Sequence, residues 1–294
     1  MNIKAMLFLY LRKIKRRVKF IENILYTIQK KINYKIQIQY NNKIIILPML
    51  NGVGAGNIVK GEAWMDKLIE ALSQNKVGAF IDVGVNIGQT LIKVKSIDPD
   101  IQYIGFEPNP NCYSYICELI KENNFLDCDI FPVGLSSKDE IVTLFSGGNI
   151  GSNASIIEEF RDPSYYSMKF HVPVFQGDKI FSNLGLDSIS IIKIDVEGGE
   201  LEVLQGLENV IIKYKPYIIC EILPIGDETT TRGRFRKKRQ TQLEKALNYF
   251  EYKIYRICKN GSFISLDTIE THSDVTLSNY VFSHKNQIDK LINF

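Results

Sequence analysis

The stretch Ala79-Phe80-Ile81-Asp82-Val83-Gly84-Val85-Asn86-Ile87-Gly88-Gln89-Thr90 decides how this chain of 294 residues folds. Its apolar run closes on Asp82 and predicts a buried strand, and a helical pattern begins where the stretch ends. Between them, Gly84 and Gly88 frame Asn86 in a tight turn, because glycine allows close backbone approach and asparagine tolerates a left-handed conformation. The helix N-terminus beyond offers unpaired N–H groups to a carboxylate or phosphate. A strand–helix corner that binds nothing can need the same glycines, so the turn alone leaves both interpretations open.

The residues that follow narrow the class of ligand. Residues 101–106 predict a second strand, and Glu107 stands at its end, 19 residues past Gly88. In nucleotide-binding α/β folds, an acid about 20 residues past the glycine turn accepts hydrogen bonds from the ribose hydroxyls. A dinucleotide fingerprint needs three glycines spaced G-x-G-x-x-G, and this chain lacks them.

Three blocks, in order, resemble the FkbM family of class I S-adenosylmethionine-dependent methyltransferases: FIDVGVNIGQT (80–90), GFEPNP (105–110) and IIKIDVEGGELEVLQG (191–206). The resemblance covers roughly residues 78–283, with Asn86 where many relatives have a middle glycine. It implies an α/β, Rossmann-like fold with a mostly parallel sheet, helices on both faces and late antiparallel strands. It also implies S-adenosylmethionine as the cofactor. Ser136, after the third predicted strand, is expected near the adenine by position only. The full set of expected cofactor-binding residues is Asp82, Gly84, Asn86, Gly88, Glu107, Asn109, Ser136 and Asp195.

Acidic residues collect where the fourth and fifth predicted strands end. The apolar run 190–194 leads into Asp195 and Glu197, and Glu221 interrupts a later apolar run. In methyltransferases this edge faces the transferred methyl, so Asp195 and Glu197 are the first candidates for catalysis, followed by Glu221 and His171. Two structural alternatives stay open, because Asp195 could cap the next helix and Glu221 could be held in a salt bridge.

The remaining sequence alternates between helical and extended patterns, as a parallel sheet with crossover helices requires. Residues 146–170 are rich in Gly, Ser and Asn and predict either a lid over the site or an ordinary surface loop. The strands are predicted at 130–133, 140–145, 217–222 and 280–283, the hairpins at 34–48 and 252–266, and the helices at 62–74, 89–95, 110–124, 201–213 and 242–249.

Residues 1–31 differ from the rest of the chain in charge. They hold nine Lys or Arg and one acid, for a net charge of +8, whereas the whole chain carries +3. Apolar residues recur there every three or four positions, which predicts one amphipathic helix. Such a helix could lie on an anionic membrane or dock onto protein, and both remain open. Its apolar run, 5–11, is too short to span a bilayer and no cleavage site follows, so no transmembrane helix or signal peptide is predicted.

The predicted organisation is a basic helix (1–31), a hairpin with an entry helix (32–77), an FkbM-like domain (78–284) and a tail (285–294). The five cysteines lack metal-ligand spacing and are interpreted as reduced thiols, which favours a cytoplasmic protein, with peripheral contact at the inner membrane face as an option. Asp195 and Glu197 lie two apart without a clear third ligand, so no metal is predicted.

The resemblance implies methyl transfer to an oxygen, and the expected acceptor is a hydroxyl on a sugar, glycan or sugar-lipid. The alternatives are a secondary metabolite, a nucleic acid, or a binding module without catalysis. The basic segment 232–239 could meet nucleic acid or a sugar phosphate, or form a solvated loop. Nucleic acid is disfavoured, because IDVEGG has neither the Pro-containing motif of amine methylation nor a nucleophilic Cys. The retained acids Asp82 and Glu107 argue against a non-catalytic module, and the oligomeric state stays open.

Overall fold

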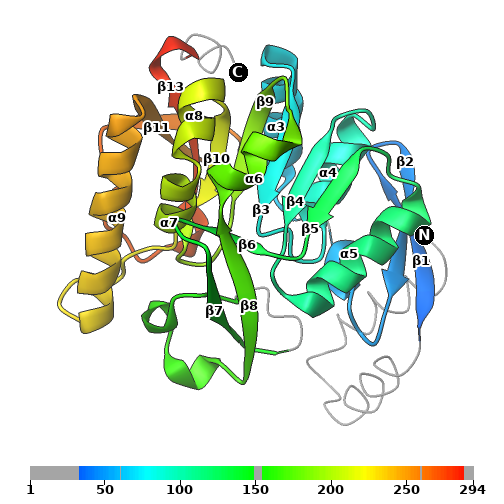
Figure 1. Cartoon of the computed structure of the whole chain (residues 1–294), viewed down its shortest axis with the longest axis horizontal. Coiled ribbons are helices and arrows are strands. Elements are labelled where there is room, and N and C mark those ends of the chain that lie inside the picture. The colour runs from blue at the N-terminus through cyan, green and yellow to red at the C-terminus, as the bar shows by residue number, and fades with distance from the viewer. Residues whose placement is uncertain (1–32, 60, 149–153, 259, 288–294) are drawn as a thin grey trace.

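The computed structural model describes residues 33–59, 61–148, 154–258 and 260–287 (Figure 1). The basic helix predicted over 1–31 lies outside these residues, as does most of the predicted tail. No helix within the described ranges is long and apolar enough to cross a bilayer.

One mixed sheet of eight strands organises the fold, in the order β12-β11-β13-β10-β9-β3-β4-β5. Its strands β10, β9, β3, β4 and β5 run parallel, and the pairs that involve β11, β12 and β13 are antiparallel. The predicted Rossmann-like sheet with late antiparallel strands is confirmed. The strands are β3 (Ala79–Val83), β4 (Tyr103–Phe106), β5 (Cys128–Phe131), β9 (Ile189–Ile194), β10 (Tyr217–Glu221), β11 (Tyr252–Ile257), β12 (Phe263–Leu266) and β13 (Asn279–His284).

Helices cover both faces of this sheet, because successive side chains of a strand point to opposite faces. In β3, Phe80 belongs to one apolar core and Ile81 to the other. The first core also contains the hairpin of β1 (Tyr34–Tyr40) and β2 (Lys43–Met49), so this hairpin shares a core with the main sheet. The helices on its side are α3 (Ala63–Asn75), α4 (Gln89–Ile97) and α5 (Pro110–Asn123); those opposite are α6 (Gly177–Leu184), α7 (Glu200–Gly206), α8 (Glu208–Tyr214) and α9 (Thr231–Tyr249).

The chain changes direction at β3, and this positions the site. From β3 it continues through β4 to β5 on one side, and it returns on the other side as β9 and β10. Ligands of open α/β sheets bind at such a switch point, outside the carboxyl ends of the strands. Gly84 follows β3 there with φ of 90°, and an added Cβ would lie 2.0 Å from the carbonyl oxygen of Asp195. Glycine is therefore needed for the ends of β3 and β9 to approach.

A separate small sheet projects beyond the main one (Figure 1). It consists of β6 (Gly134–Ser136), β8 (Met168–Gln176) and β7 (Glu140–Ser146), in that order. The segment 146–170, predicted to be a loop, includes the last residue of β7 and the first three of β8. Its described part between these strands contains the short 3-10 helices Glu158–Phe160 and Pro163–Tyr165.

Several predicted elements were wrong in detail. The helix predicted at 201–213 is two helices that meet at Leu207, and β5 begins two residues before the predicted strand. The basic segment 232–239 is not a loop but the first half of α9. The Thr230 hydroxyl starts this helix by accepting a hydrogen bond from the backbone N–H of Gly233 at 2.9 Å.

Candidate functional site

Two cavities meet at the carboxyl ends of β3 and β9. The first reaches from β3 across β4 to the small sheet and encloses about 700 Å³, counting space open to solvent. The second lies on the α3 and α4 side and is mostly polar. The lining residues that the two cavities share are Gly84, Asn86, Asp195 and Glu197.

Glu107 is the central polar residue of the first cavity. It is 6% exposed, and its two carboxylate oxygens accept the backbone N–H groups of Asn86 (2.6 Å) and Asn109 (2.8 Å). Burial raises the pKa of Glu107 to about 7, although these two hydrogen bonds oppose the shift. A carboxylate has about four acceptor positions, so further hydrogen bonds remain available for a ligand.

The predicted residues that surround Glu107 have identifiable structural roles. Asn86 has φ of 52° and Gly88 has φ of 78°, and a Cβ on Gly88 would lie 2.8 Å from Leu119. The Asn109 Oδ1 accepts the backbone N–H of Asn111 and caps α5, while its buried Nδ2 has no hydrogen-bond partner within the described residues. The turn after β3 is thus shaped as predicted, and the start of α5 carries one unused buried donor.

Cations bind two of the acids around the second cavity. The Lys193 Nζ lies 3.3 Å from Asp82 Oδ1 and 3.3 Å from Asp195 Oδ2. The Arg161 Nη2 lies 2.5 Å from Glu197 Oε2. Asp82, which is fully buried and also accepts the Tyr103 hydroxyl at 2.5 Å, lines neither cavity. Asp82 therefore holds the Lys193 ammonium in position without itself lining a cavity.

Glu221 differs from its neighbours, since its carboxyl has no ion-pair partner in the described part of the chain. Desolvation raises its pKa to about 8, and the charges of Asp195 and Glu197 add to the shift. Desolvation and the Asp195 charge likewise raise the pKa of Glu197 to about 7, and Arg161 opposes this. The alternative that Glu221 is held in a salt bridge is therefore not supported by any ion pair among the described residues.

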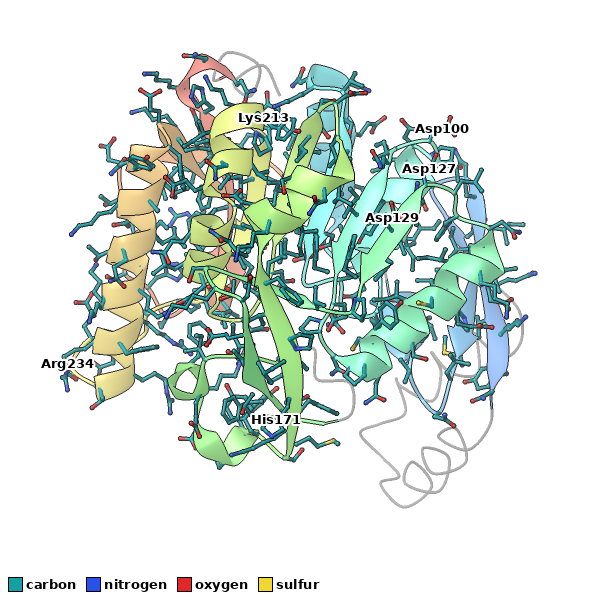
Figure 2. All side chains as sticks on the ribbon, in the orientation of Figure 1. Asp100, Asp127, Asp129, His171, Lys213 and Arg234 are labelled. Atoms are coloured by element: carbon teal, nitrogen blue, oxygen red, sulfur yellow. The ribbon has the colours of Figure 1, made fainter. Side chains whose placement is uncertain are left out.

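The remaining predicted residues lie elsewhere. His171 is exposed on β8, toward the far end of the small sheet (Figure 2), and lines neither cavity. Ser136 is buried in β6, and the first cavity is lined by its neighbours Gly134 and Leu135. Asp195 does not cap α7, whose N-cap residue is Gly199 without a side-chain hydrogen bond.

Sequence reasoning missed several residues of the second cavity, among them Asn57, Arg161 and Lys193. Lys193 left a signal, because a lysine inside the apolar run Ile189–Ile194 needs a buried partner. Asn57, in a short 3-10 helix, and Arg161, between β7 and β8, left no such signal.

Comparison with known proteins points to one family. The family model "Methyltransferase FkbM domain" matches residues 82–257. Methyltransferase sdnD of Sordaria araneosa is 26% identical over 156 residues, 44% of this chain and 60% of that protein. The hexuronic acid methyltransferase AglP of Haloferax volcanii is 29% identical over 143 residues, 48% of this chain and 54% of that protein. The chain thus matches less than two thirds of either relative.

Solved structures are more distant. The FkbM methyltransferase from Methylobacillus flagellatus is 15% identical with a TM-score of 0.44, over 70% of this chain and 43% of that one. An O-methyltransferase from Bacillus cereus is 10% identical with a TM-score of 0.44, over 76% of this chain and 81% of that one.

Proposed function

Because the chain belongs to the FkbM methyltransferase family, we propose that it transfers a methyl group to a hydroxyl of a sugar, glycan or sugar-linked lipid. The cofactor is S-adenosylmethionine, which supplies a methyl group activated on a positively charged sulfur. The first cavity fits this cofactor. Glu107 keeps free acceptor positions for two ribose hydroxyls, and Phe106 and Leu135 provide apolar walls for an adenine ring.

The observation that carries the proposal is the second cavity, which adjoins the first and contains a carboxyl suited to act as a base. Methyl transfer to a hydroxyl is helped by a base within about 3 Å that removes the proton. A base works best when its pKa lies near the working pH, and the pKa of Glu197 is raised to about 7 and that of Glu221 to about 8. Of the two, Glu197 is paired with a cation, whereas Glu221 has no ion-pair partner in the described part of the chain. We assign the proton transfer to Glu221.

Asp195 and Glu197 are proposed to orient the acceptor, since they line both cavities and therefore border the path between them. Their ion pairs with Lys193 and Arg161 hold the two carboxylates in place. Alignment of this kind can contribute several kcal/mol to the lowering of the barrier.

The second cavity carries charges of both signs. Asp195, Glu197, Glu221 and Glu62 line it, and so do Lys93, Lys193 and Arg161, so these charges suit a neutral or an acidic sugar. The similarity to AglP, which is named for a hexuronic acid, supports a sugar as the acceptor. Nucleic acid is less favoured, because Arg236 and Arg239 of the basic segment are engaged within the protein.

The test is methyl transfer from tritium-labelled S-adenosylmethionine to glycan and lipid extracts, followed by mass analysis of the labelled product. A methyl ether on a hydroxyl resists mild alkali, whereas a methyl ester on a carboxyl is hydrolysed. Alkali-stable label on a sugar supports the proposal. Alkali-labile label would assign carboxyl methylation instead, and label on nucleic acid or a non-sugar metabolite would replace the acceptor class.

A further inference from the structure

One wall of the second cavity comes from residues that precede the family match at 82–257. Asn57 lies in the 3-10 helix Ala55–Ile58 and is 6% exposed. Its Nδ2 donates to the carbonyl oxygen of Ile87 (2.7 Å) and contacts the Tyr115 hydroxyl (3.2 Å). A carbonyl can only accept, so this contact fixes the orientation of the amide. The Oδ1 of Asn57 is then left buried without a partner.

Glu62, on the same wall, is held in an unusual backbone conformation. Its φ is 53°, in the left-handed region that non-glycine residues rarely adopt, and no side-chain cap explains it at the start of α3. Such strain persists where the surrounding structure enforces it, and it is frequent at ligand sites.

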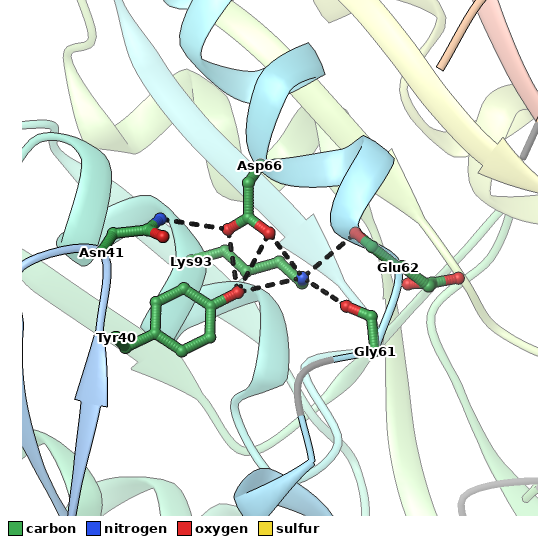
Figure 3. Close-up of polar contacts among 6 residues, drawn as sticks. All are labelled: Tyr40, Asn41, Gly61, Glu62, Asp66 and Lys93. Atoms are coloured by element: carbon green, nitrogen blue, oxygen red, sulfur yellow. Dashed lines mark hydrogen bonds and ion pairs between the residues drawn. The ribbon is translucent and has the colours of Figure 1, made fainter. Parts of the chain in front are cut away.

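A buried lysine enforces this conformation. The Lys93 Nζ donates to the backbone carbonyl oxygens of Gly61 (2.7 Å) and Glu62 (3.3 Å). It also lies 3.2 Å from Asp66 Oδ2 and 3.2 Å from the hydroxyl of Tyr40, which in turn donates to Asp66. Figure 3 shows this network joining β1, α3 and α4, with the Glu62 carboxylate pointing away from it. Lys93 therefore fixes the turn and leaves the carboxylate free.

The Glu62 carboxyl faces the chemical end of the site. It lines the second cavity together with Lys193, Asp195 and Glu221. Desolvation raises the pKa of Glu62. The positive charge of Lys193 opposes this shift, and the negative charge of Asp195 adds to it. Asn57 and Glu62, which carry these two acceptors, thus line the same cavity as the end of β9.

We propose that Asn57 and Glu62 bind an N–H or O–H donor group of one of the reactants, and that Lys93 acts as a positioning residue through the Glu62 turn. Two groups have this chemistry. One is the α-ammonium of the amino-acid end of the methyl donor. The other is a hydroxyl of the acceptor, a case that rests on the proposed function.

Calorimetry with S-adenosylhomocysteine and with 5′-methylthioadenosine, which lacks the amino-acid end, separates these sources. If the pair binds the ammonium, Glu62→Ala should weaken S-adenosylhomocysteine binding roughly 10- to 100-fold and leave methylthioadenosine binding unchanged. Glu62→Gln should not restore the affinity, because the ammonium needs the charge. Glu70→Ala, on the exposed side of α3, is the matched control.

If the pair binds the acceptor, Glu62→Ala should leave S-adenosylhomocysteine affinity intact and raise the apparent KM for the labelled extract by a similar factor. The maximal rate should stay within about twofold, and Glu62→Gln should restore part of the KM, because an amide oxygen still accepts from a hydroxyl.

The role of Lys93 is tested by a double-mutant cycle on the affected constant. If Lys93 acts through Glu62, Lys93→Met should change the affected constant in the wild-type protein but not in the Glu62→Ala variant. If Lys93 has a purely structural role, the effects of the two substitutions on that constant should add. The proposal is overturned if folded Glu62→Ala changes neither constant. If the wild-type protein labels no extract, the proposed function fails, and unchanged S-adenosylhomocysteine affinity then overturns this proposal independently.

Discussion

Three carboxyls at one edge of the sheet differ because their partners differ. Asp195 is paired with Lys193 and Glu197 with Arg161, and Arg161 opposes the burial that raises the pKa of Glu197 to about 7. Glu221 has no such partner among the described residues, and its pKa rises to about 8. Its carboxyl is largely protonated at pH 7 and becomes a base as the pH rises. A base that titrates near the working pH can take a proton and release it again.

Replacing Glu221 by Gln should therefore lower turnover by roughly 10²–10⁴, the usual range for loss of a general base. The wild-type rate should rise with pH through about 8 or somewhat lower when the cationic cofactor is bound, and this rise should vanish in the variant. Asp129→Asn, on the exposed side of β5 (Figure 2), controls for the chemical change. Near-normal turnover in Glu221→Gln, with a large loss in Glu197→Gln or Asp195→Asn, would move the base to that residue.

Glu107→Ala should weaken S-adenosylhomocysteine binding at least tenfold, because a hydrogen bond to a charged acceptor contributes about 1.5–3 kcal/mol. The backbone N–H groups of Asn86 and Asn109 also lose their acceptor in this variant. Calorimetry measures the affinity, and the melting temperature shows whether the turn has collapsed. An unchanged dissociation constant in a folded variant would remove Glu107 from the cofactor site.

The elements that were predicted well from the sequence are those that are buried on both faces. Strand β9 is buried along its whole length, so a continuous apolar run identifies it. Its lysine could not be assigned a partner, because the partner depends on strand register. Asp82 on β3 stands directly opposite Lys193 on β9, and neither residue reveals this from its own neighbours in sequence. The position of the acids at the carboxyl ends of the strands could be predicted from the sequence. The ion pairs that these acids form could not.

The basic half of α9 was not predicted to be helical, because its local signals oppose a helix. Cations near a helix N-terminus interact unfavourably with the helix dipole, and this half has no acid in its first turn. Tertiary contacts stabilise it instead. The Arg236 guanidinium donates to the carbonyl oxygens of Pro224 and Phe160, each at 2.7 Å. Arg239 pairs with Glu202 and donates to the carbonyl oxygen of Gly198 at 2.7 Å.

Arg236→Ala should therefore loosen the segment that carries Arg161, since Phe160 loses its contact with α9. We expect a loss of about 1–3 kcal/mol in unfolding free energy, because two carbonyls lose a charged donor. Hydrogen exchange should increase in residues 154–167. Lys238→Ala, which removes an exposed cation from the same helix, is the matched control. Equal exchange in both variants would show that Arg236 does not hold this segment.

The candidate site extends further toward the N-terminus than the family match. Tyr40, Asn57 and Glu62 precede residue 82, yet they line the second cavity together with Asp195 and Glu221. The hairpin and α3 also share one apolar core with the main sheet. The predicted boundary between 32–77 and 78–284 therefore separates segments that together form one site.

Contact with an anionic membrane remains a proposal that rests on the +8 charge of residues 1–31. Each Lys or Arg near such a surface contributes about 1 kcal/mol, and salt screens the attraction. Full-length protein should therefore sediment with acidic liposomes at low salt, less so at high salt, and not with neutral liposomes. Deleting residues 1–31 should abolish sedimentation and preserve turnover of a soluble acceptor, because the described residues that line the two cavities fall between Tyr40 and Leu223. Equal sedimentation of both forms would favour docking of this segment onto protein, and a loss of turnover on deletion would connect it to the site.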